Sequence, residues 1–451
     1  MTANIRFNNE PTRIVRQLSN AGYEAYVVGG AVRDYLLGKT PKDYDIATNA
    51  LPEDVRRVFG RHNCQIIGRR FRLALVHSGK NVYEVSTFRR EPSPKERKGR
   101  KGDDGVMIWN DNAYGTLEDD VKRRDFTVNA LYANVLTGEI LDKCGGMDDI
   151  KSRCVRMIGD PQLRFQEDPV RMLRALKLVG QHGLKLSRAV QSALHKLAPE
   201  IAKSSRSRLL EEIIKILLCG HSVDVLTQCR KHGLLQYFWP GLDNSWGSEP
   251  CRVMLELLSL NDKENRDMHK ENPDRFIALA CVCMPYFLYR CDNAEPDKDM
   301  FPEGLDVSGL ECQLPLMQVR KICSGVVHEL FNGYIVSREL QYDLQAVLVR
   351  LRMILKGMMP RTALPRVSYE YLFELLRLRS MLDGAGAMAL VSMPLPFEYM
   401  QDENATDNLN MEAQLEMSEI LSSMGRKKHR KKRKKKATAA ANEVIEGENM
   451  Q

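Results

Sequence analysis

Two aspartates separated by a single residue, Asp43 and Asp45, are well suited to bind a metal ion. In an extended strand, residues i and i+2 point to the same face, so the two carboxylates are expected to project side by side. Adjacent carboxylates repel each other unless a cation lies between them, and Mg²⁺ prefers oxygen ligands. Because Asp-x-Asp is also common in solvated turns, the surrounding residues must decide whether it binds metal.

A glycine pair, Gly29 and Gly30, follows an apolar stretch at 26–28 and precedes Arg33. Glycines let backbone N–H groups come close to a phosphate, although Gly-Gly alone is usually a turn. The combination of an apolar strand, Gly-Gly, Arg-Asp and Asp-Tyr-Asp is much rarer than any of its parts. It indicates a metal site beside a phosphate site, which is the arrangement that nucleotide chemistry needs.

Two later segments carry similar groups. Residues 116–132 read TLEDDVKRRDFTVNALY, where two arginines that could bind phosphate in a bidentate fork precede Asp125. Residues 167–174 read EDPVRMLR and are expected to open a helix on which Asp168 and Arg171 are neighbours. This pair is either a helix cap with an internal ion pair or an acceptor and a donor that read the edge of a base.

The spacing of apolar residues predicts an α/β head followed by a long all-α region. In the head, helices are expected at 12–20 and 52–59, and strands at 24–29, 44–46, 73–77, 82–87, 130–136 and 139–142. From about residue 167 the period becomes 3.6, which predicts helices at 168–181, 187–198, 206–219, 223–233, 251–260, 274–290, 314–331, 337–355 and 368–381. Residues 89–106 are charged and contain Gly and Pro, which favours a flexible loop.

The length of 451 residues predicts two to four domains, and a hydrophobic content of 43% is typical of a globular protein. The sequence contains no run of 18 or more apolar residues, so no membrane-spanning helix is predicted. The first residues lack the apolar core of a signal peptide. The 11 cysteines are scattered without the spacing of a zinc site. Together these features favour a cytoplasmic protein with reduced cysteines.

The net charge of +8 comes from one segment, residues 426–436, which reads RKKHRKKRKKK and leaves a charge of −2 for the rest of the chain. Its basic residues are Arg426, Lys427, Lys428, Arg430, Lys431, Lys432, Arg433, Lys434, Lys435 and Lys436. Such a run cannot bury apolar surface, so residues 396–451 are expected to be mostly disordered. The run is either a solubilising tail or a segment that binds RNA through counterion release, and we favour RNA binding.

Five segments together resemble the class II branch of the polymerase-β-like nucleotidyltransferases, which comprises bacterial poly(A) polymerases and the CCA-adding enzymes of transfer RNA. They are GGAVRD (29–34), KDYDIAT (42–48), EVSTFR (84–89), RRDFTVNALY (123–132) and EDPVRMLRALK (167–177), all within about 20–240. The resemblance implies a nucleotidyltransferase head with a mixed sheet, followed by helical regions. The corresponding domains are the head (1–150), a helical neck (151–240), a helical body (241–395) and the basic tail (396–451).

The resemblance also implies two-metal transfer of a nucleoside monophosphate to an RNA 3′ hydroxyl. Asp43 and Asp45 match the Mg²⁺ ligands, and Asp125 matches a third catalytic acid, for which Glu84 is a competing candidate. The matches to nucleotide-binding residues are Gly29, Gly30, Arg33, Arg123 or Arg124, Asp168, Arg171 and Arg174. Among these, Asp168 and Arg171 match the pair that reads the incoming base without a nucleic-acid template.

One segment separates the two activities of this family. Residues 66–77, IIGRRFRLALVH, are similar to a signature of bacterial poly(A) polymerases, whereas CCA-adding relatives usually carry Gly-x-x-Phe-Gly-Thr there. Arg72 stands in place of the second glycine. Residues 208–220 also resemble the poly(A) polymerase neck, with Glu212 and Lys215 in the pattern. The expected function is therefore a polynucleotide adenylyltransferase that uses ATP and two Mg²⁺ ions.

The expected partners are ATP and the 3′ ends of messenger and small RNAs, with transfer RNA and RNA-decay proteins as further candidates. A CCA-adding enzyme, which would also accept CTP, is the alternative within the same class. An RNA-binding scaffold with an inactive head is the alternative from another class. The intact Asp43, Asp45 and Asp125 argue against the scaffold.

Overall fold

The computed structural model describes residues 7, 9–41, 43–68, 72–79, 81–91, 100–101, 107–108, 113–267, 274–300, 314–357 and 366–383. The chain divides into two compact units. The first comprises residues up to Ile216 together with His221–Asp243, and the second comprises Leu217–Gly220 together with the residues from Asn244 onward.

The first unit is built on a mixed sheet. Its strands are β1 (Ala25–Val28), β2 (Asp45–Thr48), β3 (Cys64–Ile67), β4 (Leu73–Ser78), β5 (Asn81–Thr87), β8 (Leu131–Asn134) and β9 (Glu139–Asp142). Their spatial order is β3-β4-β5-β2-β1-β8-β9. Among these pairs only β2 and β5 run parallel, with Ile46 opposite Val85. The residues one step earlier, Asp45 and Glu84, therefore lie at the same level and on the same face of the sheet.

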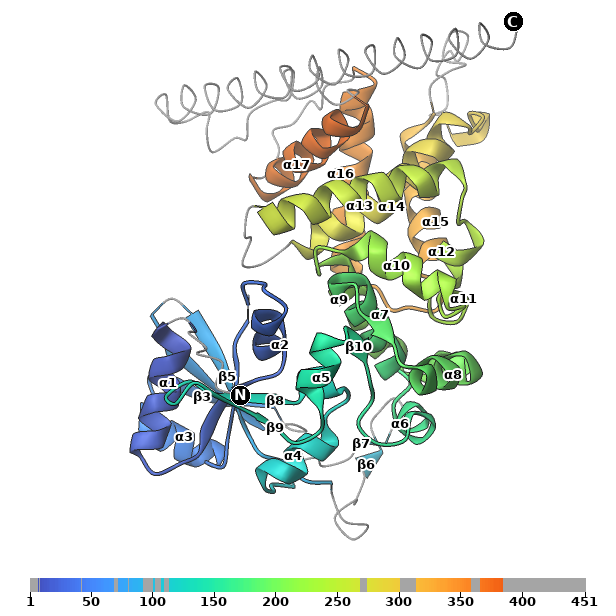
Figure 1. Cartoon of the computed structure of the whole chain (residues 1–451). Helices are drawn as coiled ribbons and strands as arrows, with labels where there is room; N and C mark the ends of the chain where they lie inside the picture. Colours follow the sequence, from blue (N-terminus) through green and yellow to red (C-terminus); the bar gives the residue numbers. More distant parts are fainter. Residues whose placement is uncertain are drawn as a thin grey trace, which may run out of the picture. The chain divides into compact units, whose positions relative to one another are not determined.

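Helices pack on this sheet through their apolar faces. Helix α1 (Asn9–Asn20) contacts β1, and α3 (Pro52–Phe59) contacts β3, β4 and β5 (Figure 1). Helix α4 (Leu117–Arg123) buries Leu117 and Val121 in a cluster that includes Ala47 of β2 and Tyr132 of β8. Because Asp45 lies two residues before Ala47, its side chain is on the face of the sheet that α4 covers.

The rest of the first unit is mainly helical. Its elements are α2 (Gly30–Leu36), η1 (Thr127–Asn129), α5 (Gly146–Lys151), β10 (Cys154–Val155), α6 (Pro161–Glu167), α7 (Arg171–His182), β11 (Lys185–Leu186), α8 (Arg188–Leu197), η2 (Ala198–Lys203), α9 (Arg206–Leu217), α10 (Ser222–Lys231), α11 (Leu235–Phe238) and α12 (Pro240–Asn244), with a short pair β6 (Arg100–Lys101) and β7 (Met107–Ile108). Helices α7 and α10 approach closely at Gly180, where an added Cβ would lie 2.7 Å from the Val225 Cα.

The second unit consists of helices around one apolar helix. Its elements are α13 (Glu249–Asp267), α14 (Arg275–Asp292), η3 (Lys298–Met300), α15 (Leu316–Leu330), α16 (Arg338–Leu355) and α17 (Arg366–Asp383). Helix α14 contacts α13, α15, α16 and α17, which explains why it is buried on nearly all sides. Within the described residues, no helix combines the length and the apolar character needed to cross a membrane.

The structure confirms the predicted fold, a mixed α/β head followed by a mostly helical region. One helix start was predicted too early, because α7 begins at Arg171 rather than at 168. Pro169 disfavours helical backbone at the residue before it, and Asp168 accordingly has φ −149°. Strand β3 and the short helices α2 and α4 were not predicted. The expectations for 396–451 and for most of 89–106 fall outside the described residues, and the predicted domain boundaries stay predictions.

Candidate active site

The carboxylates of Asp45 and Glu84 lie on neighbouring strands, and Asp43 comes just before β2. Asp43 is therefore not on a strand, contrary to the expected alternation, because β2 pairs with β1 only as far as the Asp45–Val28 pair. Burial among protein atoms, followed by the negative charges of Glu84 and Asp43, raises the pKa of Asp45 to about 6, and Arg124 opposes this shift. Mutual repulsion of this kind would be relieved by a bound cation.

Gly29 lies beside Asp45. This residue has a positive φ of 74°, a conformation that favours glycine. A Cβ added to it would lie 3.6 Å from Arg124 Nη1 and 3.7 Å from Asp45 Oδ2. Gly29 thus lies next to both the predicted metal ligand and a predicted phosphate-binding arginine.

Arg33 lies beside the second glycine and is held on two sides. Its Nε donates to Asp34 Oδ1 at 2.8 Å, and its Nη1 donates to Asn129 Oδ1 at 2.7 Å. A Cβ added to Gly30 would lie 3.4 Å from Arg33 Nη2. Gly29 thus lies beside Asp45 and Gly30 beside Arg33, and Asp34 and Asn129 orient the arginine.

The two consecutive arginines at the end of α4 have different surroundings. Arg124 donates through Nε to Tyr132 Oη at 2.8 Å and through Nη2 to Asp120 Oδ2 at 3.0 Å. Arg123 Nη1 is buried and has no hydrogen-bond partner among the described residues. Arg124 is therefore a fixed positive charge next to Asp45, whereas Arg123 has a buried donor without a partner among the described residues.

A second group of charges lies where α7 begins. Asp125 accepts hydrogen bonds from Arg171 Nε and Arg174 Nη1, both at 2.7 Å. Asp168 Oδ2 accepts from Arg208 Nη2 of α9 at 2.6 Å, and Arg171 Nε is 3.9 Å from the same oxygen. One network of ion pairs thus joins Arg208 to four of the predicted site residues, Asp125, Asp168, Arg171 and Arg174.

The structure places Asp125 among arginines and Glu84 beside Asp45. Within the described parts of the chain, no three or more His, Cys, Asp or Glu side chains are arranged to hold one metal ion. Mg²⁺ usually binds through one or two carboxylates and takes its other ligands from water and substrate phosphates. Asp43 and Asp45 would be those carboxylates. The ten basic residues of 426–436 lie outside the described residues.

Sequence reasoning missed several side chains that hold the predicted ones in place. Asp34 and Asn129 lie inside the motifs GGAVRD and RRDFTVNALY, so the motifs themselves could have suggested them. Tyr132 also lies in the second of these motifs, and Asp120 lies just before it. Tyr132 donates to Asp120 Oδ2 at 2.5 Å, and both bind Arg124. Arg208 lies 40 residues after Asp168 and could be found only from the fold.

Two family models match the chain. The family described as "Poly A polymerase head domain" matches residues 25–156, and the one described as "Probable RNA and SrmB-binding site of polymerase A" matches residues 183–245. The chain belongs to the class II nucleotidyltransferases, the family that contains bacterial poly(A) polymerases and CCA-adding enzymes.

Two curated relatives represent the two branches. The chain is 38% identical over 273 residues to poly(A) polymerase I of Haemophilus influenzae, covering 59% of this chain and 60% of that protein. It is 39% identical over 228 residues to the CCA-adding enzyme of Leuconostoc mesenteroides subsp. mesenteroides, covering 51% and 54%. The match to the poly(A) polymerase is thus longer at similar identity, and the chain spans less than two thirds of either relative.

A solved structure described as a tRNA-processing enzyme in an apo form shares the fold. Its TM-score is 0.52 at 22% identity, over 85% of this chain and 91% of that chain. An identity this low supports the common fold alone.

Proposed function

We propose that this chain is a polynucleotide adenylyltransferase, which adds AMP from ATP to RNA 3′ ends. The observation that supports the use of a single nucleotide is the ion-pair network around Asp168 and Arg171. Adenine and cytosine both present an amino donor beside a ring-nitrogen acceptor, so an Asp–Arg pair could read either base. If the two side chains could change orientation, they could bind cytosine and adenine in succession. If they are held in one orientation, they would favour one of the two bases.

Here both members of the pair are held by other side chains. Arg208 binds Asp168 at 2.6 Å, and Asp125 binds Arg171 at 2.7 Å while Glu167 accepts from it at 3.0 Å. This restraint supports selection of one nucleotide rather than successive addition of C and A. The longer match to poly(A) polymerases and the presence of Arg72 in the 66–77 segment favour adenine as that base.

The other residues have roles that follow from their positions. Asp43 and Asp45 would hold Mg²⁺, which supplies charge stabilisation for the attacking and departing oxygens in this class of reaction. Gly29 would lie against the triphosphate. Arg33 and Arg124, whose side chains are held by hydrogen bonds, would place positive charges beside the triphosphate. Glu84 is the better candidate for the third acid, because it lies next to Asp45 and raises its pKa, whereas Asp125 is neutralised by two arginines.

Primer extension with each nucleoside triphosphate in turn tests the proposal. We expect ATP alone to give a long ladder on an unstructured RNA. Arg208→Ala should release Asp168 and raise CTP incorporation relative to ATP about tenfold, the effect of losing one charged hydrogen bond. Arg188→Ala, which removes an exposed arginine from α8, is the matched control.

A CCA-adding enzyme would behave differently in the same assay. It would need CTP first, would stop after three nucleotides on a transfer RNA that lacks its 3′ end, and would extend the unstructured RNA poorly. That result would replace the proposal with the alternative. An inactive scaffold would bind RNA and incorporate none of the four nucleotides.

A further inference from the structure

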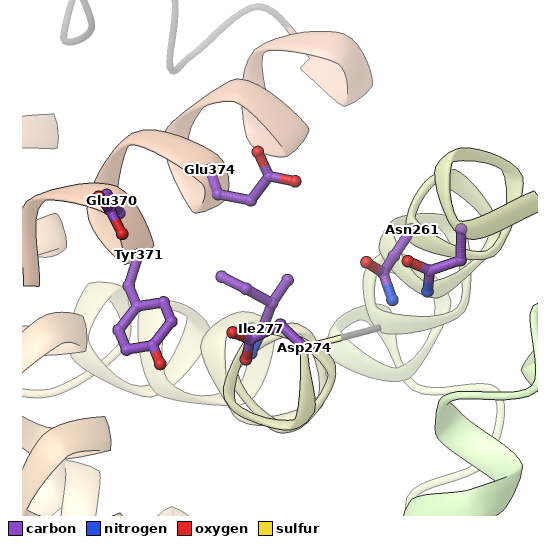
Figure 2. A pocket seen from close by; sticks show the side chains of 7 residues that line it. Asn261, Asp274, Ile277, Glu370, Tyr371 and Glu374 are labelled. Carbon is purple, nitrogen blue, oxygen red and sulfur yellow. The ribbon is translucent and has the colours of Figure 1, made fainter. Parts of the chain in front are cut away.

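The second unit contains a pocket that the proposed transfer reaction does not use. It lies among α13, α14 and α17 and has a volume of about 220 Å³ (Figure 2). The residues that line it are Asn261, Asn265, Asp274, Ile277, Glu370, Tyr371 and Glu374. Three of these side chains are carboxylates, and within the described lining none carries a positive charge.

Two of the pocket's carboxylates have hydrogen-bond partners that can be named. Asp274 Oδ1 accepts hydrogen bonds from two backbone N–H groups, those of residues 276 and 277, which carry no net charge. Arg377 donates to Glu374 and also to Glu264, so one guanidinium serves two carboxylates. Burial, and then the charges of Asp274, Asp343 and Glu370, raise the pKa of Tyr371, as a negative potential requires.

A buried hydrogen-bond donor also faces the pocket. Asn261 is only 4% exposed, and its Nδ2 has no hydrogen-bond partner among the described residues. Figure 2 shows Asn261 on α13 and Glu374 on α17 at the edges of the space between these helices. A buried donor without an acceptor is unfavourable, so a ligand that brings an oxygen acceptor would bind there.

These features specify the chemistry of a ligand. It needs an ammonium or guanidinium group for the carboxylates and an oxygen acceptor for Asn261. A lysine or arginine residue in a polypeptide provides both, through its side chain and its backbone carbonyl. A polyamine lacks the acceptor, and RNA phosphates would be repelled by the carboxylates.

We propose that the pocket binds a Lys/Arg-rich segment, and that this segment is the chain's own residues 426–436. The run carries ten positive charges, whereas the rest of the chain has a net charge of −2. Asp383, where α17 ends, and Arg426 are separated by 42 residues, and a chain of that length can reach up to roughly 140 Å, so chain length allows the run to meet the pocket. Because the run is tethered to the chain, its effective concentration at the pocket is in the millimolar range. The pocket would therefore be occupied even if the intrinsic affinity is weak.

Occupancy would have a consequence for RNA binding. Basic residues bound to Asp274, Glu370 and Glu374 cannot neutralise RNA phosphates at the same time, so the pocket and RNA compete for the run. This competition rests on the proposed function, whereas the binding of the run to the pocket does not.

Fluorescence anisotropy with a labelled RKKHRKKRKKK peptide tests the binding directly. The peptide is titrated at physiological salt into the full-length chain and into a full-length variant whose ten basic residues in 426–436 are changed to Gln. We expect saturable binding to the variant. In the native chain the intact run should compete and weaken the apparent affinity about tenfold, if the intrinsic Kd is on the order of 0.1 mM.

Substitutions in the pocket locate the site. Asp274→Asn keeps a good helix cap while removing a charge, and Glu370 is exposed, so the pair Asp274→Asn and Glu370→Gln should fold. In the Gln-substituted background this pair should weaken peptide binding about tenfold. The control pair Glu295→Gln and Glu339→Gln makes the same change in net charge on exposed residues of the same unit.

Two results would overturn the proposal. Equal weakening by the pocket pair and the control pair would mean that the peptide senses only overall charge. Equal peptide affinity of the native chain and the Gln-substituted chain would mean that the tail is not the occupant. Carbodiimide cross-linking of the native chain gives an independent readout, because it joins a lysine amine to a contacting carboxylate with loss of water. Cross-links from 426–436 should concentrate on Asp274, Glu370 and Glu374.

Discussion

Replacing Asp45 by Asn should abolish nucleotidyl transfer and at the same time stabilise the fold at neutral pH. The pKa of Asp45 rises from 3.8 to about 6 in the folded chain. A carboxylate whose pKa is higher in the folded state is destabilising when it is charged. The penalty is therefore fully present above pH 6 and is relieved as the pH falls through 6 toward 4.

The size of the effect follows from the shift and from exposure. A shift of about two pKa units corresponds to about 3 kcal/mol for a fully buried group. Asp45 is still accessible to solvent, and screening reduces this to about 1 kcal/mol. For a unit of this size, the melting temperature should rise by about 2–4 °C.

Calorimetry without divalent ions at pH 7.5 and pH 4 measures this difference. The gain of Asp45→Asn should be present at pH 7.5 and absent at pH 4, and added Mg²⁺ should stabilise the native chain but not the variant. Asp148→Asn, at an 86% exposed side chain, is the control and should change little. A lower melting temperature for Asp45→Asn at pH 7.5, or transfer activity within tenfold of the native chain, would refute the reasoning.

Three further outcomes are expected. Glu84→Gln should reduce kcat at least a hundredfold with an unchanged KM for ATP. Asp125→Asn should mainly raise the KM for ATP, because Arg171 and Arg174 lose the carboxylate that holds them. The reverse pattern would make Asp125 the third acid. Burial and the positive charges of Arg33 and Lys39 lower the pKa of His182 to about 2, so the folded chain should lose stability below about pH 6.5, where only the unfolded chain takes up the proton. Chemical denaturation should give a slope of up to about 1.4 kcal/mol per pH unit, which His182→Gln should flatten. Deleting 426–436 should weaken RNA binding and reduce its salt dependence by about 0.7 per lost phosphate contact without changing the KM for ATP, and an unchanged salt slope would mark the run as a solubilising tail.

The sequence predicted most of the fold because its signals are local. The nine helices expected from 167 onward each correspond to a described helix, since an apolar face with period 3.6 needs only neighbouring residues to be seen. Strand β3 was missed because its pattern covers only four residues, Cys64–Ile67. Helix α4 was missed because its seven residues bury only Leu117 and Val121.

The site was predictable to the extent that it lies within contiguous motifs. The proximity of Gly29, Arg33 and Asp45 follows from one segment that turns between β1 and β2. The pairing of Asp168 with Arg208 depends on how α9 packs beside α7, which no spacing in the sequence encodes. Both Glu84 and Asp125 lie within plausible motifs, so the sequence alone did not favour either as the third acid. The proposal of Glu84 rests on the parallel register of β2 and β5.

That parallel register also bears on how the protein is made. Asp45 and Glu84 are 39 residues apart in the chain, and parallel strands cannot be joined by a tight hairpin. The intervening α3, β3 and β4 must therefore be synthesised before β5 can pair with β2, and this long-range pairing carries the entropic cost of closing the loop between them. On the proposed role of Glu84, a ribosome-bound chain that has not yet extended through β5 lacks an essential carboxylate. It would thus be unable to extend the RNA ends around it while it is still being translated.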